Sequence, residues 1–183
     1  MSTDDSQVPY LETTPPATYR ILESVTDRAS AQWMEQFEPK FSRALRYFDD
    51  LAGQTVTVAH LKPSKEYVLS DPIAVADPHN NILYFDTAHE VSYLTIFHEL
   101  AHLEIYTQSD QGRDVPVTSE EYCSIYAVAL MDEHLIDRDR IAYLGHPAVH
   151  RNEWPEICQR ALEYREDHRN YVQKVKEWLE TEV

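Results

Sequence analysis

The residues of this chain whose types and spacing best suit chemistry form the pattern His-Glu-Leu-Ala-His at positions 98–102. Side chains four residues apart on an α-helix lie one above the other, so His98 and His102 can direct their imidazoles at a single metal ion. Glu99 then lies beside them, where a carboxylate can take a proton from a water molecule that the ion has acidified. The spacing therefore predicts a zinc site in which Glu99 is the general base, as amide hydrolysis requires.

The helix that carries this pattern is expected to be buried, because apolar residues surround the pattern on nearly every side. These residues are Val91, Leu94, Ile96, Phe97, Leu100, Ala101, Leu103 and Ile105. A buried polar group without a partner costs on the order of 1–3 kcal/mol, so the two histidines and Glu99 need ligands or hydrogen bonds. Histidines that are satisfied by hydrogen bonds in an ordinary core are the alternative to a metal site.

A third ligand has to come from another part of the chain, because a catalytic zinc ion takes three protein ligands and keeps one position open. Residues 103–117 contain no histidine, which disfavours the zincins whose motif is extended by a third histidine. A carboxylate at the start of the next predicted helix is the remaining source. Glu120 and Glu121 are both candidates.

We rank Glu121 ahead of Glu120 as the third ligand, because Glu121, Ile125 and Val128 form one stripe that would face inward. A structural role competes with this assignment. Thr118-x-x-Glu121 is also a capping box, and the helix dipole favours an acid at this end. Glu121 could therefore cap the helix, bind the metal or do neither.

The histidine pattern together with residues 121–131 resembles the two signature helices of the ImmA/IrrE-type zinc metallopeptidases, which are minimal gluzincins. In that family the second helix begins with a metal-binding glutamate and continues with small and apolar residues. The resemblance implies Zn²⁺ as the cofactor and a peptidase that acts on a partner protein, with Glu99 as the general base. The implied ligands are His98, His102 and Glu121.

The resemblance covers residues 54 to 132 and departs from the family pattern at two positions. Asp132 stands where the family usually has proline, and Cys123 replaces a common asparagine. The sequence shows no DNA-binding module, so cleavage of a transcriptional repressor, the usual action of the family, follows less directly than the metal site. A noncatalytic protein that keeps the metal for structure, or that binds a partner, is the alternative.

The composition disfavours nucleic acids and anionic membranes as direct partners, because 32 acidic residues oppose 16 basic ones and give a net charge of −16. Few of the cations are lysines, and the acids are dispersed over the chain, as in proteins from salt-loving organisms. The sequence lacks an apolar leader and any apolar run near ~20 residues, which predicts a soluble cytoplasmic protein. Cys123 and Cys158 are expected to be free thiols packed in the core.

We predict a single α+β, zincin-like domain over residues 17–183, preceded by a flexible tail over residues 1–16. From Ala17 the apolar residues recur at helical spacing, so two helices separated by Pro39 are expected before Gly53. The apolar period then changes to two, which indicates a small, mostly antiparallel sheet. Its strands are predicted near residues 55–58, 67–69, 73–76 and 82–85. The turn-forming residues 77–81 are expected to join the last two strands in a hairpin.

The sheet should lead into the histidine-bearing helix, which we expect to be capped by Thr87 or a neighbour and to end near Tyr106. The glutamate-bearing helix follows, and a long helix over residues 155–181 closes the chain. At about 40 Å, this last helix could extend past the core into a homodimer contact.

Further histidines and tyrosines are candidates for the site. His134 follows late in the glutamate-bearing helix, and His146 and His150 are four residues apart. A tyrosine could donate a hydrogen bond to the oxyanion that forms during hydrolysis, and the sequence does not choose among three of them. They are Tyr106, Tyr126 and Tyr143.

Overall fold

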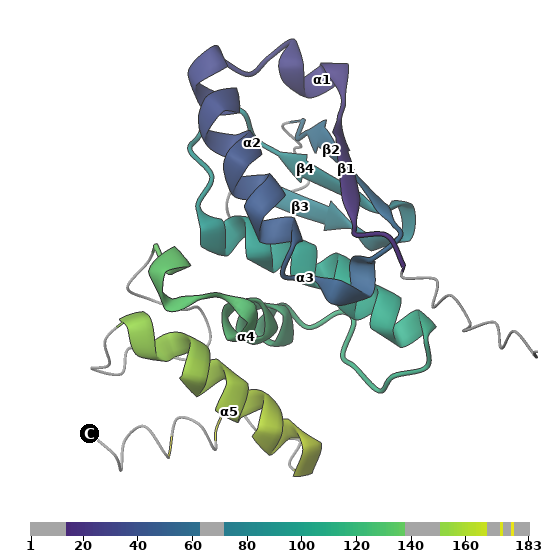
Figure 1. Cartoon of the computed structure of the whole chain (residues 1–183), viewed down its shortest axis with the longest axis vertical. Helices are drawn as coiled ribbons and strands as arrows, with labels where there is room; N and C mark the ends of the chain where they lie inside the picture. Colours follow the sequence, from purple (N-terminus) through teal and green to yellow (C-terminus); the bar gives the residue numbers. More distant parts are fainter. Residues whose placement is uncertain (1–13, 63–71, 138–150, 168–172, 174–176, 178–183) are drawn as a thin grey trace, which may run out of the picture.

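A computed structural model describes residues 14–62, 72–137 and 151–167 and the single positions 173 and 177 (Figure 1). Within these residues the chain has an α+β fold, as predicted, with five helices and a four-stranded mixed sheet. The strands are β1 (Thr18–Ile21), β2 (Thr55–His60), β3 (Ala74–Asp77) and β4 (Ile82–Phe85), and the helices are α1 (Glu23–Thr26), α2 (Ala31–Leu45), α3 (Tyr93–Asp110), α4 (Glu120–Leu130) and α5 (Trp154–Asp167). Short 3-10 helices occur at η1 (Asp49–Leu51), η2 (Pro78–Asn80), η3 (Glu133–Leu135) and η4 (Arg151–Glu153).

The sheet has the strand order β1-β2-β4-β3. β1 pairs with β2 and β2 pairs with β4 in parallel, whereas β3 and β4 form an antiparallel pair. The predicted β3–β4 hairpin is therefore confirmed, but the prediction of a mostly antiparallel sheet is wrong. β1, which was predicted as helix, adds one parallel pair, and α2 lies in the crossover from β1 to β2 that parallel pairing needs. The other parallel pair joins β2 to β4, and β3 lies between these two strands in the chain.

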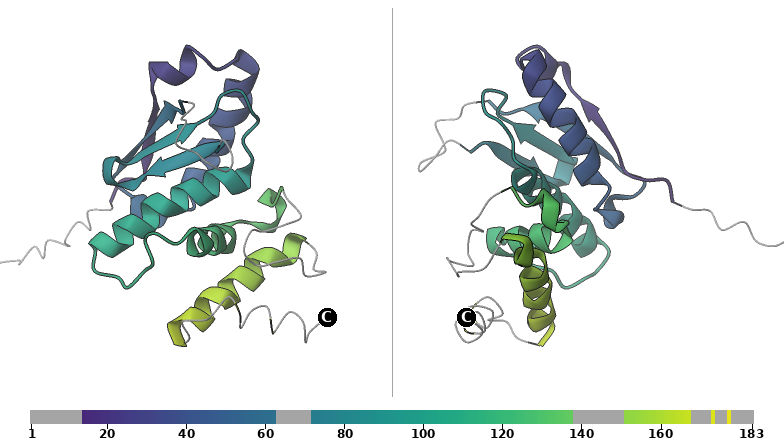
Figure 2. Two further views of the ribbon diagram at one scale, coloured as in Figure 1. Left: turned by 180° about the vertical axis from the view of Figure 1, so that it is seen from behind. Right: turned by 60° about the vertical axis from the view of Figure 1, so that its left-hand side comes forward.

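Helix α2 covers one face of the sheet (Figures 1 and 2). Its buried aromatic residues pack on β4, with the ring of Phe37 4.9 Å from that of Phe85. We expected Pro39 to separate two helices, and this is wrong, because one helix runs through it. Pro39 lies on the exposed face, while Phe37 and Phe41 on either side of it are buried and hold both halves of the helix against the sheet.

Helix α3 lies between the sheet and α4, and α5 packs on the far side of α4 (Figure 2). Ser92 caps α3 by accepting a hydrogen bond from the backbone N–H of Thr95, and Asp137 accepts one from Tyr93 at 2.6 Å. The expected cap at Thr87 is therefore wrong. The helix also runs one turn beyond Tyr106, because the polar residues that suggested a loop include Gln108, which is buried and hydrogen-bonded.

Several predictions lie outside the described residues. They are most of the tail over residues 1–16, the strand near 67–69, the pair His146 and His150, and Tyr143. The long C-terminal helix is described as α5 up to Asp167, and most of the segment expected to form a dimer contact lies beyond it. Among the helices described here, none combines the length and the apolar character needed to cross a bilayer.

Candidate metal centre

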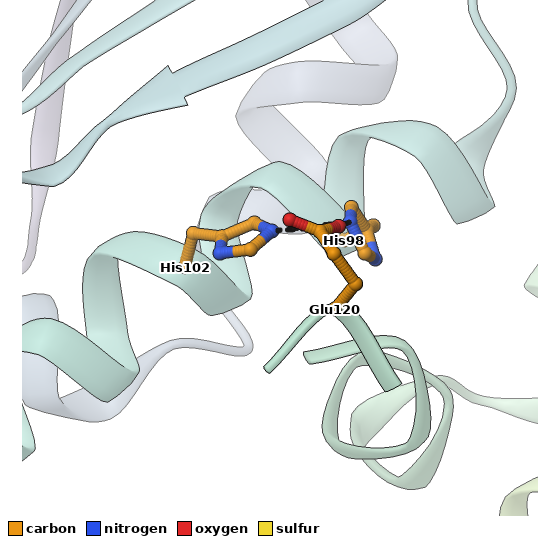
Figure 3. Close-up of side chains that lie close together, drawn as sticks. All are labelled: His98, His102 and Glu120. Atoms are coloured by element: carbon orange, nitrogen blue, oxygen red, sulfur yellow. Dashed lines mark hydrogen bonds and ion pairs between the residues drawn. The ribbon is translucent and has the colours of Figure 1, made fainter. Parts of the chain in front are cut away.

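His98, His102 and Glu120 bring three potential metal-binding atoms together where α3 meets the start of α4 (Figure 3). Oε2 of Glu120 lies 3.0 Å from Nε2 of His98 and 3.4 Å from Nε2 of His102. The two Nε2 atoms are 3.1 Å apart. The imidazoles are partly buried and the glutamate is exposed, so the cluster is accessible from solvent.

Two helices position this cluster. His98 and His102 are one turn apart on α3, and their rings meet edge to face with centroids 4.8 Å apart. Glu120 is the first residue of α4, which begins there because Ser119 caps the helix by accepting a hydrogen bond from Tyr122. The packing of α4 against α3 then brings Glu120 to both imidazoles.

Two further side chains of α4 orient the imidazoles from their other edge. Oγ of Ser124 lies 3.1 Å from Nδ1 of His98, and Sγ of Cys123 lies 3.3 Å from Nδ1 of His102. An Nδ1–H that donates to such an acceptor leaves the lone pair on Nε2, which is the atom facing Glu120. Glu120, Cys123 and Ser124 are spaced i, i+3 and i+4, so a single face of α4 supplies the carboxylate and both orienting groups.

Sequence reasoning missed the role of Ser124 and assigned Cys123 only to core packing. The spacing from Glu120 was the signal that could have identified both. The thiol of Cys123 is buried, and burial raises its pKa to about 12, so it meets His102 as a neutral thiol.

The ranking of Glu121 ahead of Glu120 needs correction, because the structure brings Glu120 to the histidines and does not place Glu121 in the cluster. The stripe of Glu121, Ile125 and Val128 does contain buried residues, but it is not the face that meets the imidazoles. The predicted capping box is also absent from α4. With Ser119 at the N-cap, the third helical residue is Tyr122, so Glu121 is not at the position that a capping box uses.

The three donor atoms fit a zinc ion. Bonds of ~2.0–2.1 Å in a tetrahedral zinc site separate neighbouring donor atoms by about 3.3 Å, and the three separations here are 3.0, 3.1 and 3.4 Å. Two imidazoles and a carboxylate are also a donor set that suits zinc. Hydrogen bonding to His98 lowers the pKa of Glu120, and burial lowers the pKa of His102. Both shifts favour the protonation states that bind a cation.

Glu99 is buried beside the cluster, with 7% of its surface exposed. Burial raises the pKa of its carboxyl to about 7, and the nearby Glu120 carboxylate acts in the same direction. The charge of His98 and a hydrogen bond from the backbone of Ala76 on β3 act in the opposite direction and offset part of this rise in pKa. Glu99 is therefore held at a fixed position beside the cluster, where its carboxylate can accept a proton.

A pocket of about 570 Å³ opens beside these residues, and Glu99, His102 and Glu120 all line it. Three residues of β3 form part of its wall, and Tyr106 and His79 form another part. The other candidates lie elsewhere. Tyr126 donates to Glu104, and His134 contacts the guanidinium of Arg43 on α2.

A scan against protein-family models finds no matching family, and searches of curated proteins and of solved structures find no match. The resemblance to the ImmA/IrrE-type peptidases stays a prediction. A functional assignment therefore depends on the geometry of the site.

Proposed function

We propose that this chain is a zinc-dependent peptidase in which His98, His102 and Glu120 hold Zn²⁺ and Glu99 is the general base. The observation that carries the proposal is the convergence of two imidazole nitrogens and a carboxylate oxygen at 3.0–3.4 Å. A buried carboxylate in the same pocket supports it. The ImmA/IrrE-like pattern of the sequence points to the same chemistry.

Zn²⁺ bound at such a site supplies a Lewis acid and lowers the pKa of water. Glu99 takes the proton that water loses as its oxygen attacks the peptide carbonyl carbon. The same carboxyl then gives the proton to the departing amine nitrogen as the C–N bond breaks. One carboxyl can serve both transfers, because the proton that it takes from water is the proton that it gives to the amine.

A protein or peptide substrate is proposed from the shape and lining of the pocket. β3 is an edge strand of the described sheet and contributes Ala74, Val75 and Ala76 to the wall. The backbone of an edge strand can pair with an extended peptide. Together with the family resemblance, this favours a regulatory peptidase that acts on a partner protein.

Replacing Glu99 with glutamine tests the proposal. The amide keeps the size of the side chain but is not a base, so hydrolysis of a pool of internally quenched peptides should fall about 10²–10⁴-fold. The bound zinc should remain, because Glu99 is not a ligand. Assays in low and in molar salt would also cover the salt adaptation that the acidic composition suggests.

Glu104→Gln is a matched control, since Glu104 is also a buried glutamate of α3 and lies on the opposite face of that helix. It should leave hydrolysis unchanged. Equal activity of Glu99→Gln and the unsubstituted chain would contradict the assignment of the base. Stoichiometric zinc with no hydrolysis by the unsubstituted chain would favour the noncatalytic scaffold.

A further inference from the structure

Tyr106 and His79 form a hydrogen-bonded pair in the wall of the pocket beside the metal centre. Oη of Tyr106 lies 2.8 Å from Nδ1 of His79, and the two rings meet edge to face with centroids 4.8 Å apart. The peptidase chemistry proposed above does not use this pair. A substrate that fills the pocket would lie against the side chain of Tyr106.

Tyr106 follows His102 by four residues on α3, so its side chain extends the row that His98 and His102 begin. Both Tyr106 and His102 line the pocket. A peptide whose carbonyl lies at the metal centre would therefore have Tyr106 one helical turn further along the same wall.

A short, well-anchored turn holds His79. It belongs to η2, which connects the two strands of the β3–β4 hairpin. Asp77 caps this turn by accepting a hydrogen bond from the backbone of Asn80, and Asn81 closes it in a left-handed conformation with φ of 55°. The turn therefore presents the His79 ring to Tyr106 from a second element of the fold.

The direction of the hydrogen bond decides what Tyr106 can do. A tyrosine hydroxyl has one proton and can also accept, whereas a neutral histidine carries its proton on only one ring nitrogen. When Nδ1 of His79 carries the proton, it donates to Oη, and the phenol proton stays available for an acceptor in the pocket. In hydrolysis the strongest acceptor is the carbonyl oxygen, where negative charge develops.

We propose that Tyr106 donates a hydrogen bond to the carbonyl oxygen of the scissile peptide and that His79 is a positioning residue that orients the Tyr106 hydroxyl. This inference rests on the proposed peptidase function. It also separates two tyrosines that the sequence left equivalent, because the hydroxyl of Tyr126 donates to Glu104 instead.

The kinetic test compares Tyr106→Phe, His79→Ala and His79→Asn in the zinc-loaded full chain with internally quenched peptides. Tyr106→Phe should lower kcat by about 10²-fold, as loss of an oxyanion donor does, with KM changed little. His79→Ala should lower kcat as well. His79→Asn should restore most of the rate, because the asparagine amide nitrogen occupies the place of Nδ1 and can donate to Oη.

The double variant Tyr106→Phe/His79→Ala should be no slower than Tyr106→Phe alone, since His79 acts through Tyr106. Tyr93→Phe is the control, because it removes a phenol from the first turn of the same helix, outside the residues that line the pocket. It should leave kcat unchanged. Thermal unfolding and zinc content of each variant show that the fold and the metal centre are intact.

A readout independent of turnover is the protonation of His79 in ¹⁵N-labelled protein. The proposal predicts a proton on Nδ1, and a proton on Nε2 alone would overturn it. Unchanged kcat in Tyr106→Phe, or a rise in KM alone, would also overturn the inference while leaving the peptidase function intact. Absence of hydrolysis by the unsubstituted chain would overturn both.

Discussion

Oε2 of Glu120 lies 3.0 Å from Nε2 of His98, although the two residues are 22 positions apart in the sequence. This contact ties the N-terminus of α4 to the middle of α3. Because Cys123 and Ser124 reach the same pair of imidazoles from the next turn of α4, the rotation of α4 about its axis determines the whole centre. The geometry of the site is therefore a property of how these two helices pack.

Replacing Ser124 with alanine should weaken zinc binding about 10-fold to 100-fold, the range that loss of a group orienting a metal-binding histidine causes. The hydroxyl at Nδ1 of His98 would be lost, while all three ligands remain. Competition with a chromophoric chelator measures the affinity. Ser109→Ala in the last turn of α3 is the control, and equal affinities of the two variants would show that Ser124 does not orient His98.

Part of this architecture could be predicted from the sequence because local signals were strong. The turn residues between β3 and β4 and the apolar run that follows them predicted the hairpin, and β4 occupies the predicted residues 82–85. The apolar surroundings of the histidine pattern predicted a buried α3. In each case the residues themselves determine the local structure.

Other features depended on contacts that local pattern does not show. β1 has only four residues, and its apolar positions also fit the helical spacing that continues into α1 and α2. Its partner β2 lies more than 30 residues later in the chain. The strand exists because the sheet offers an edge to it, which is tertiary information.

The choice between Glu120 and Glu121 failed for a related reason. Residues 122–129 of α4 are almost all buried, because α3 covers one side of this helix and α5 covers another. A helix that is apolar on most sides has no single stripe that identifies the face toward one particular neighbour. The apolar period therefore could not determine which glutamate faces the histidines.

A buried polar network on the other face of α3 should contribute to stability without affecting the metal. The hydroxyl of Tyr126 donates to Glu104 and accepts from Gln108, both at 2.9 Å. Tyr126→Phe removes these two hydrogen bonds in the interior and should lower the free energy of unfolding by about 1–3 kcal/mol. Urea denaturation measures the change, with zinc content as the control. An unchanged unfolding midpoint would contradict the role of this network.

The thiol of Cys158 should not react with a thiol reagent at pH 8 until the protein unfolds. The residue has no exposed surface, and burial raises the pKa of the thiol above its ordinary value of 9.0. The unfolded chain releases this proton near pH 9 while the native state keeps it, so the free energy of unfolding should fall as the pH rises above that value.

A thiol titration with and without denaturant measures the reactivity. Burial also raises the pKa of the Cys123 thiol, to about 12, so both thiols should appear only in denaturant. Cys158→Ala should remove one of the two reactive groups. Rapid labelling of Cys158 in the native protein would show that α5, which carries this residue, does not pack against α4 as described.

The most direct test of the metal centre is the zinc content of three forms purified side by side: the unsubstituted chain, Glu120→Gln and Glu121→Gln. The two substitutions are chemically identical and affect adjacent residues, but only Glu120 lies within reach of the histidines. We predict about one zinc ion per chain in the unsubstituted protein and in Glu121→Gln, and a large loss in Glu120→Gln. Zinc-free unsubstituted protein after reconstitution, or a loss of zinc confined to Glu121→Gln, would contradict the account.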